Sequence, residues 1–364
     1  MRRRTRWALA LLALVALAGA AVAALARQAW TTLHTPYRGF DGEEVYVEVP
    51  SGLSGRAILA RLRDAGVLPE TRWARLWLVH RLGDPPLAAG EYRFRGATTP
   101  VAVLELLRRG EVALFPATVI EGLTLHETAA ALAAAGVADR ASLVAAFTSP
   151  RARALVADLD PEAGDLEGYL FPDTYLFPRR VAPDEVAAAL VASFQQRFAT
   201  EIRPLLAPDA ALRRVVILAS LVEKEAQLDA ERPVIAAVYA NRLRLRMTLG
   251  ADPTIIYGLK LAGSWDGNLR RVHLETDGPY NSYRRPGLPP TPICSPGLAS
   301  LAAAAAPATT DALYFVSRND GSHVFSRTLA EHNREVERWQ RQYWRERRAA
   351  AAGQPRRDAT RDPD

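Results

Sequence analysis

Three different patterns of apolar and polar residues follow one another along the chain. The first is an uncharged apolar run from Trp7 to Ala26, long enough to cross a ~30 Å hydrocarbon layer as a helix. It is preceded by four arginines: Arg2, Arg3, Arg4 and Arg6. A cleaved signal peptide would have a shorter apolar region before a small-residue cleavage site, which AVAALA partly imitates. We predict a retained transmembrane helix over 7–26, in the cell (inner) membrane, with residues 1–6 cytoplasmic and the remainder extracytoplasmic or periplasmic, because positive charge stays inside.

A short-period pattern begins at Val45. VYVEVP alternates like a strand, SGRAILARLRDAG and TRWARLWLVHRLG have helical patterns, and GEYRFRG predicts a second strand. Ser54 is a suitable N-cap and Gly66 a suitable stop for the first of these helices. With a helix at 101–109 and a strand at 113–120, residues 45–120 form a predicted βααβ module that resembles the LysM-like domains of wall-binding proteins. Residues 27–44 would then be a tether.

The third pattern is mostly helical and extends over residues 121–344. Proline, glycine or capping residues bound four such stretches: TLHETAAALAAAG, DEVAAALVASFQQRF, AALRRVVILASLVEKEA and RPVIAAVYANRLRLR. Between Thr248 and Pro296, crowded prolines, glycines and aromatics predict a loop-rich insert, and residues 345–364 are predicted to be disordered. The predicted fold class is α+β, with a transmembrane helix, a small module and a larger, mostly helical domain that has a loop-rich insert.

Charge and cysteine content exclude several classes of protein. The 46 Lys and Arg exceed the 40 Asp and Glu, but the excess lies at the two ends and the middle is nearly neutral, which argues against nucleic-acid binding. The single cysteine, Cys294, cannot form an internal disulfide or a zinc cluster. His273, His323 and His332 are far apart in sequence and are expected to be structural or surface residues. A cofactor-free, metal-free protein is the simplest interpretation.

Glu223 and Glu225 flank Lys224 at the end of an apolar helical stretch for which Asp209 is a candidate N-cap. Residues two apart on a helix differ by about 200° in azimuth, so the two carboxyls point to nearly opposite sides. Each rises from an apolar strip, where desolvation raises the pKa of a carboxyl and keeps it protonated as a general acid requires. This pair cannot face each other across one bond, as a two-carboxylate glycosidase needs. A solvated helix end is the other interpretation of such a triplet.

Several stretches together resemble a known family. They are ILASLVEKEA, ERPVIAAVYANRLRLRMTLGADPTIIYG, YNSYRRPGLPPTPICSPG and YFVSRNDGSHVFSRTLAEHN, with EGLTLHETAAAL and LEGYLFPDTYLFP upstream. In this order they are similar to the YceG/MltG-type endolytic murein (peptidoglycan) transglycosylases, from the anchor to about Trp339. The resemblance implies cleavage of the β-1,4 bond between N-acetylmuramic acid and N-acetylglucosamine within nascent glycan strands. The muramoyl C6 hydroxyl would attack its own anomeric carbon, leave a 1,6-anhydro end and terminate strand elongation.

The resemblance also implies the roles of individual residues. Glu225 would be the catalytic acid and then base, with Glu223 in a supporting role. The expected substrate-binding residues are Asp252, Thr254, Tyr257, Asn281 and Tyr283. Ordinary turn chemistry or core packing is the alternative explanation for each of them. The partners implied are peptidoglycan glycan strands, membrane lipid and cell-wall synthases.

Two other functions are compatible with the sequence. A catalytically inactive glycan-binding scaffold for synthases would use the same surface without an acid. A hydrolytic muramidase would need a second carboxylate opposite Glu225, for which Glu275 and Asp277 are candidates. Anhydro ends, reducing ends or no product distinguish the lyase, the hydrolase and the scaffold.

Overall fold

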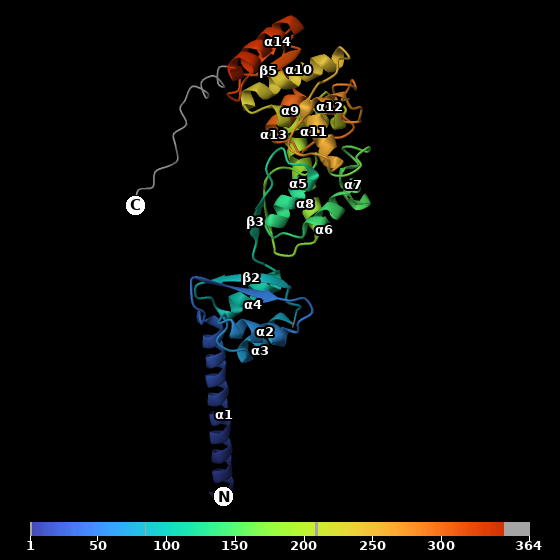
Figure 1. Cartoon of the computed structure of the whole chain (residues 1–364). Coiled ribbons are helices and arrows are strands. Elements are labelled where there is room, and N and C mark those ends of the chain that lie inside the picture. The colour runs from blue at the N-terminus through green and yellow to red at the C-terminus, as the bar shows by residue number, and fades with distance from the viewer. Residues whose placement is uncertain (1, 84, 208–209, 346–364) are drawn as a thin grey trace, which may run out of the picture. The chain divides into compact units, whose positions relative to one another are not determined.

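A computed structural model describes residues 2–83, 85–207 and 210–345 and has a helix-dominated α+β architecture (Figure 1). The predicted α+β class is confirmed at this level. The chain divides into two compact units: Met1–Pro116 with Leu176–Arg180, and Ala117–Tyr175 with Val181–Asp364. The candidate N-cap Asp209 and the tail from residue 346 onward lie outside the described residues.

The first unit contains the predicted strand–helix–helix–strand order. Its elements are α1 (Arg2–His34), β1 (Glu44–Val49), α2 (Gly55–Asp64), α3 (Arg72–Leu82), β2 (Gly90–Arg95) and α4 (Pro100–Arg109). β1 pairs antiparallel with β2, from Glu44 opposite Arg95 to Val49 opposite Gly90. Ser54 caps α2 by accepting a hydrogen bond from the backbone of Ala57. The alternating valines of β1 and the apolar faces of α2 and α4 share one core.

Helix α1 is longer than the sequence pattern indicated. Its segment from Arg6 to His34 is long and apolar enough to cross a membrane, and its most apolar window is entirely exposed. The helix continues past Ala26 because no residue stops it before Pro36, which disfavours helical backbone at the residue that precedes it. Leu33 is 6% exposed, and the ring of His34 meets that of Trp77 on α3 edge-on at 5.7 Å. The expected tether is therefore helical over residues 27–34.

The second unit is mostly helical. Its helices are α5 (Leu125–Ala134), α6 (Arg140–Phe147), α7 (Pro150–Val156), α8 (Pro183–Arg197), η1 (Phe198–Ile202), η2 (Arg203–Leu205), α9 (Leu212–Glu225), η3 (Asp229–Glu231), α10 (Arg232–Arg244), α11 (Asp252–Leu261), α12 (Arg271–Glu275), α13 (Leu298–Ala305), α14 (Leu329–Val336) and η4 (Glu337–Gln342). Its short strands are β5 (Tyr314–Ser317) and β6 (His323–Ser326), while β3 (Phe115–Thr118) and β4 (Thr174–Phe177) each have two residues in either unit. β3 pairs with β4, and β5 pairs antiparallel with β6.

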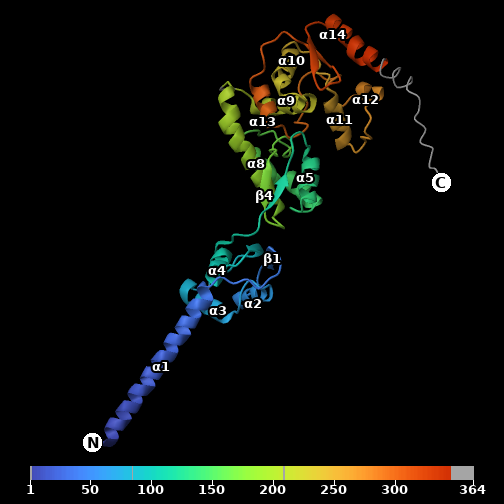
Figure 2. The same cartoon turned by 90° about the vertical axis from the view of Figure 1, so that its left-hand side faces the viewer.

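Helix α9 lies at the centre of the second unit. Eight consecutive residues, 215–222, are buried, as expected for a helix that is apolar on all sides. It packs against α10 and α13, which lie beside it in Figure 2. Its last three residues, Glu223, Lys224 and Glu225, are charged and lie where the buried part of the helix ends.

The stretch 248–296, expected to be loop-rich, contains two helices. Asp252 begins α11, and Pro253 lies in its first turn, where a proline costs no intrahelical hydrogen bond. The apolar residues that follow bury Ile255 and Tyr257. The prolines and glycines of this stretch suggested loop throughout, although this proline marks the start of a helix.

Candidate active site

Glu225 lies on the wall of a cavity of about 390 Å³ at the C-terminal end of α9. We call this the Glu225 cavity. α10, α11, β5, α14 and the loop before α11 complete its wall. The other lining residues are Arg242, Thr248, Leu249, Gly250, Asp252, Tyr283, Tyr314, Phe315, Leu329 and His332. Segments separated by more than a hundred residues thus meet at one carboxyl.

The carboxyl of Glu225 is partly buried and has a specific partner. Its Oε1 accepts a hydrogen bond of 3.0 Å from the hydroxyl of Tyr239 on α10. Burial raises the pKa of Glu225 to about 7, against the lowering effect of this hydrogen bond. The charge of Asp252 raises the pKa further and that of Arg242 lowers it. A substantial fraction of Glu225 is therefore protonated near neutral pH, as a general acid requires.

Glu223 has different surroundings, as helix periodicity predicts. Its side chain is 6% exposed, and its Oε1 lies 3.2 Å from a guanidinium nitrogen of Arg232. Its Oε2 accepts a hydrogen bond of 2.9 Å from the backbone N–H of Gly297. A Cβ at position 297 would lie 1.9 Å from a carboxylate oxygen of Glu121, so the Glu121 side chain would have to move. Glu223 is absent from the residues that line the Glu225 cavity, and it serves as the partner of a buried cation.

Asp252 and Tyr283 are the two predicted substrate-binding residues that line the cavity. The Tyr283 hydroxyl donates a hydrogen bond of 2.6 Å to Oδ1 of Asp252. Asp252 begins α11, and Tyr283 comes from the loop after α12, so this bond joins two segments of the insert. Both residues are exposed and can meet a ligand.

The other three predicted substrate-binding residues are buried, and none is among the described residues that line the Glu225 cavity. Thr254 is fully buried and donates its hydroxyl hydrogen to the Ala251 carbonyl at 2.7 Å. The side-chain amide of Asn281 donates to three backbone carbonyls, those of His273, Leu274 and Thr276. Tyr257 donates to the carboxyl of Glu167 at 3.0 Å. Their polar atoms bind within the protein, so these residues shape the insert.

Helix α10 and the C-terminal segment supply residues that the sequence analysis did not select. Arg242 donates hydrogen bonds of 2.6 Å to the carbonyls of Leu313 and Leu249, and its guanidinium lies 5.0 Å from the ring centre of Tyr314. Tyr239 and Arg242 are three residues apart, which places both on one face of α10. That spacing in an apolar helix was the signal available in the sequence.

His332, expected to be a structural or surface residue, also lines the cavity. Its ring stacks on Tyr314 at 5.2 Å, and its Nδ1 is buried without a hydrogen-bond partner among the described residues. Burial, followed by the charge of Arg242, lowers the pKa of His332, so its imidazole is neutral at neutral pH. His323, in contrast, pairs with Glu231 at 2.7 Å.

A sequence model of the YceG-like family matches residues 47–338. The chain belongs to the YceG-like family. It is 31% identical over 314 residues to an endolytic murein transglycosylase of Bacillus subtilis, and the match covers 81% of this chain and 84% of that protein. An endolytic murein transglycosylase of Streptococcus pneumoniae is 30% identical over 174 residues, which cover 47% of this chain and 32% of that one.

A solved structure of a YceG-like protein from Listeria monocytogenes is also similar. It superposes with a TM-score of 0.55 at 30% sequence identity, and the match covers 80% of this chain and 98% of that protein. The family match, over residues 47–338, includes α9 and the segments around the Glu225 cavity.

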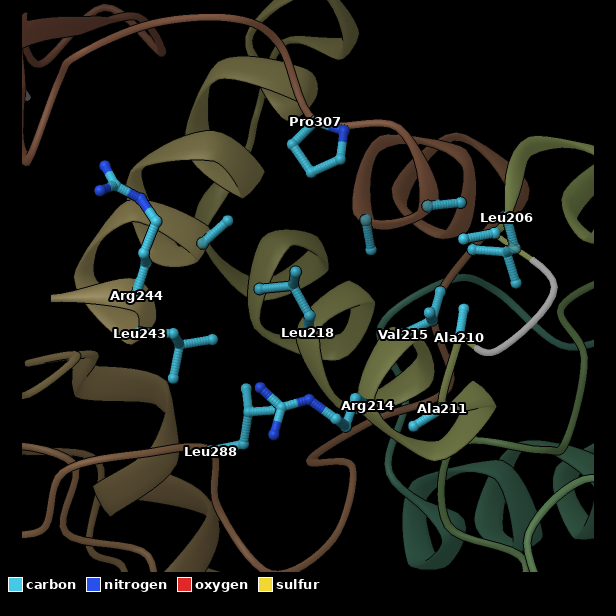
Figure 3. Close-up of a pocket in the computed structure, with 14 residues that line it drawn as sticks. Leu206, Ala210, Ala211, Arg214, Val215, Leu218, Leu243, Arg244, Leu288 and Pro307 are labelled. Carbon is cyan, nitrogen blue, oxygen red and sulfur yellow. The ribbon is translucent and has the colours of Figure 1, made fainter. Parts of the chain in front are cut away.

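Two other cavities of this YceG-like chain differ chemically from the Glu225 cavity. The first, of about 530 Å³, lies beside the N-terminal half of α9 (Figure 3). Its described lining is mostly Ala and Leu with Arg214 and Arg244, and includes no carboxyl group. The second, of about 470 Å³, lies between α11 and residues 273–281. The lining of the second includes one carboxyl group, that of Asp277, which pairs with Arg285, so a protonated general acid is better placed in the Glu225 cavity.

The candidate second carboxylates of a muramidase lie elsewhere. Asp277 borders the 470 Å³ cavity and pairs with Arg285, while Glu275 pairs with Arg271. Neither lines the Glu225 cavity, where the other carboxylate is Asp252. Across residues 2–83, 85–207 and 210–345, no three His, Cys, Asp or Glu side chains are grouped as a metal ion would require.

Proposed function

We propose that this chain is a membrane-anchored endolytic lytic transglycosylase of peptidoglycan. The observation that supports it best is a single carboxyl, Glu225, with its pKa raised to about 7 on the wall of a cavity that also has aromatic side chains. Membership of the YceG-like family and relatives named endolytic murein transglycosylase support the same conclusion. The class of reaction is a lyase reaction, in which no water is consumed.

In the proposed reaction, protonated Glu225 gives its proton to the glycosidic oxygen of N-acetylglucosamine as the bond to the muramoyl anomeric carbon breaks. The carboxylate then takes the proton of the muramoyl C6 hydroxyl, whose oxygen forms the new bond to that carbon. Glu225 ends protonated, and the product has a 1,6-anhydro end. Asp252 on the same wall would favour the positive charge that develops on the sugar ring.

Substrate contact is proposed for side chains that line the cavity. The exposed ring of Tyr283 and the Tyr314–His332 stack offer faces for the apolar surface of a sugar. Thr254, Tyr257 and Asn281 would act by holding the loops that bear Asp252 and Tyr283.

Cellular placement and the domain roles are part of the same proposal. Residues 7–26 of α1 would cross the inner membrane, with residues 1–6 cytoplasmic and both units extracytoplasmic. Residues 45–120 would be a LysM-like glycan-binding module and residues 121–344 the catalytic domain. Nascent strands close to the membrane would be the substrate, and synthases the neighbouring proteins.

The test is product analysis with the full-length protein in detergent and isolated peptidoglycan. We expect mass spectrometry to find 1,6-anhydromuramoyl ends, and Glu225→Gln to reduce their yield by about 10²- to 10⁴-fold, because an amide cannot deliver a proton. Glu275→Gln is the matched control: it makes the same chemical change outside the cavity, and its yield is expected to equal that of the wild type.

Each other outcome identifies a different function. Reducing ends that disappear with Asp252→Asn as well as Glu225→Gln would indicate a hydrolase, since Asp252 is the other carboxylate on the cavity wall. Binding of glycan without any product would indicate a scaffold. An undiminished yield from Glu225→Gln would refute the assignment of the acid.

A further inference from the structure

The phenol of Tyr239 is enclosed beside the carboxyl of Glu225. Tyr239 is 1% exposed, and its ring meets that of Phe315 on β5 edge-on, with centres 5.8 Å apart. Its position on α10 is thus fixed by packing, and water does not compete for its hydroxyl. The bond of 3.0 Å to Oε1 of Glu225 is the only hydrogen bond of this hydroxyl within residues 2–83, 85–207 and 210–345.

The direction of this hydrogen bond follows from the number of protons. Burial, followed by the adjacent charge of Glu225, raises the pKa of Tyr239 well above its usual value, so the phenol keeps its proton. That proton has one acceptor within reach, which is Oε1 of Glu225. If Oε1 of Glu225 carried the carboxyl proton, that proton and the phenol proton of Tyr239 would both lie between the two oxygens. One of these buried protons would then have no acceptor, which is costly.

The second oxygen of Glu225 has different surroundings. Oε2 forms no hydrogen bond with any described residue, yet it does not belong to the polar side-chain atoms that are buried without a partner. Because Glu225 lines the cavity, Oε2 is therefore the oxygen that remains open to it.

We infer that Tyr239 is a positioning residue: by holding Oε1 of Glu225 as an acceptor, it assigns the transferable proton to Oε2, which faces the cavity. This inference rests on the proposed function, because the proton is the one delivered to the glycosidic oxygen. Oε2 then also receives the C6 hydroxyl proton, so one oxygen performs both transfers without rotation of the carboxyl. Tyr239 touches neither substrate nor reacting atoms and acts through Glu225 alone.

The test compares Tyr239→Phe with wild type in the full-length protein, by release of anhydro ends as a function of pH. Loss of the bond is expected to lower kcat about tenfold with KM changed less than twofold. Because the bond lowers the pKa of Glu225, its removal raises that pKa and moves the alkaline limb of the kcat/KM profile to higher pH.

Tyr169→Phe is the matched control. Tyr169 is also 1% exposed and donates a hydrogen bond of 2.7 Å to a carboxylate, that of Asp160, outside the Glu225 cavity. Both variants lose a buried phenol–carboxylate bond, so similar losses of thermal stability are expected. Only Tyr239→Phe is expected to move the alkaline limb. If that limb stays in place in Tyr239→Phe, Tyr239 is merely structural and the inference is overturned.

A direct titration separates this inference from the proposed function. The ¹³C resonance of the Glu225 carboxyl, assigned by its loss in Glu225→Gln, should titrate at higher pH in Tyr239→Phe than in wild type. Absence of anhydro products with this shift present would refute the function and leave the hydrogen bond in place. Anhydro products without the shift would refute the role of Tyr239 alone.

Discussion

At the scale of the residue, the two glutamates that flank Lys224 have different roles. Glu225 lines a cavity and has a raised pKa, whereas Glu223 forms an ion pair with Arg232, whose side chain is only 8% exposed. We predict that Glu223→Gln lowers the free energy of unfolding by about 2–3 kcal/mol, because it removes one partner of a buried ion pair. The remaining partners of Arg232, Asp229 and Ser300, limit the loss.

Thermal unfolding followed by circular dichroism, together with the pH profile of cleavage, tests this prediction. The profile of Glu223→Gln should keep its shape, because the partners of Glu225 are unchanged. Glu275→Gln, which breaks an exposed ion pair, should match wild type in both measurements. Loss of cleavage at unchanged stability in Glu223→Gln would transfer the acid role to Glu223.

At the scale of the element, buried Glu167 joins α5 to α11. Its carboxyl accepts hydrogen bonds from the Leu125 N–H, at the start of α5, and from Tyr257 on α11, whose first residue is Asp252. Burial raises the pKa of Glu167 to about 8. A carboxyl whose folded pKa is raised contributes stability that is complete below its unfolded pKa near 4.5 and lost as pH rises to 8.

We therefore predict that the urea midpoint of the wild type falls between pH 5 and pH 9, and that Glu167→Gln makes this fall smaller, because a neutral amide has no charge to desolvate. Glu127 provides the opposite case: burial acts to raise its pKa, but Lys260 and Thr124 outweigh burial and lower it. Glu127→Gln should lose stability at pH 9 and little at acid pH. Parallel wild-type and Glu167→Gln curves would contradict the prediction.

At the scale of the whole molecule, α1 both carries the apolar segment and packs on the first unit through its C-terminal end. Leu33 is buried there, and His34 stacks on Trp30 at 3.8 Å and meets Trp77. A chain lacking Met1–Ala26 keeps these contacts, whereas a chain lacking Met1–His34 loses them. We predict that the chain lacking Met1–Ala26 cleaves isolated peptidoglycan normally. In the chain lacking Met1–His34, we predict that proteolysis of the first unit begins at a lower urea concentration than in the chain lacking Met1–Ala26.

In cells, the exported chain that lacks Met1–Ala26 should fail to restore normal glycan-strand lengths at equal abundance. The helical stretch 27–34 rises ~1.5 Å per residue, where an extended tether would span ~3.3 Å, so the proposed anchor would hold the first unit close to the membrane surface. Restoration by the soluble chain would show that confinement does not select the substrate.

The sequence determined the elements whose period reflects backbone geometry. The alternation of β1, the N-cap of α2 and the helical pattern of α10 are local, and a strand or helix repeats its side-chain directions at a set period. The same period placed Glu223 and Glu225 on opposite sides of the helix, each above an apolar strip, and the family resemblance then selected Glu225. The start of α11 was missed because a proline in the first turn of a helix looks like a loop proline in the sequence.

Tertiary structure alone decided which residues share the cavity with Glu225. Arg242, Tyr314 and His332 arrive there through the packing of α10, β5 and α14, and the buried Tyr239 reaches Glu225 from α10. Thr254 and Asn281, close to Asp252 and Tyr283 in sequence, turn inward. Periodicity sets the side of an element on which a residue lies, but not the element that covers that side. Contact between distant segments depends on the combined fit of their side chains, and the pKa of Glu225 depends on that contact.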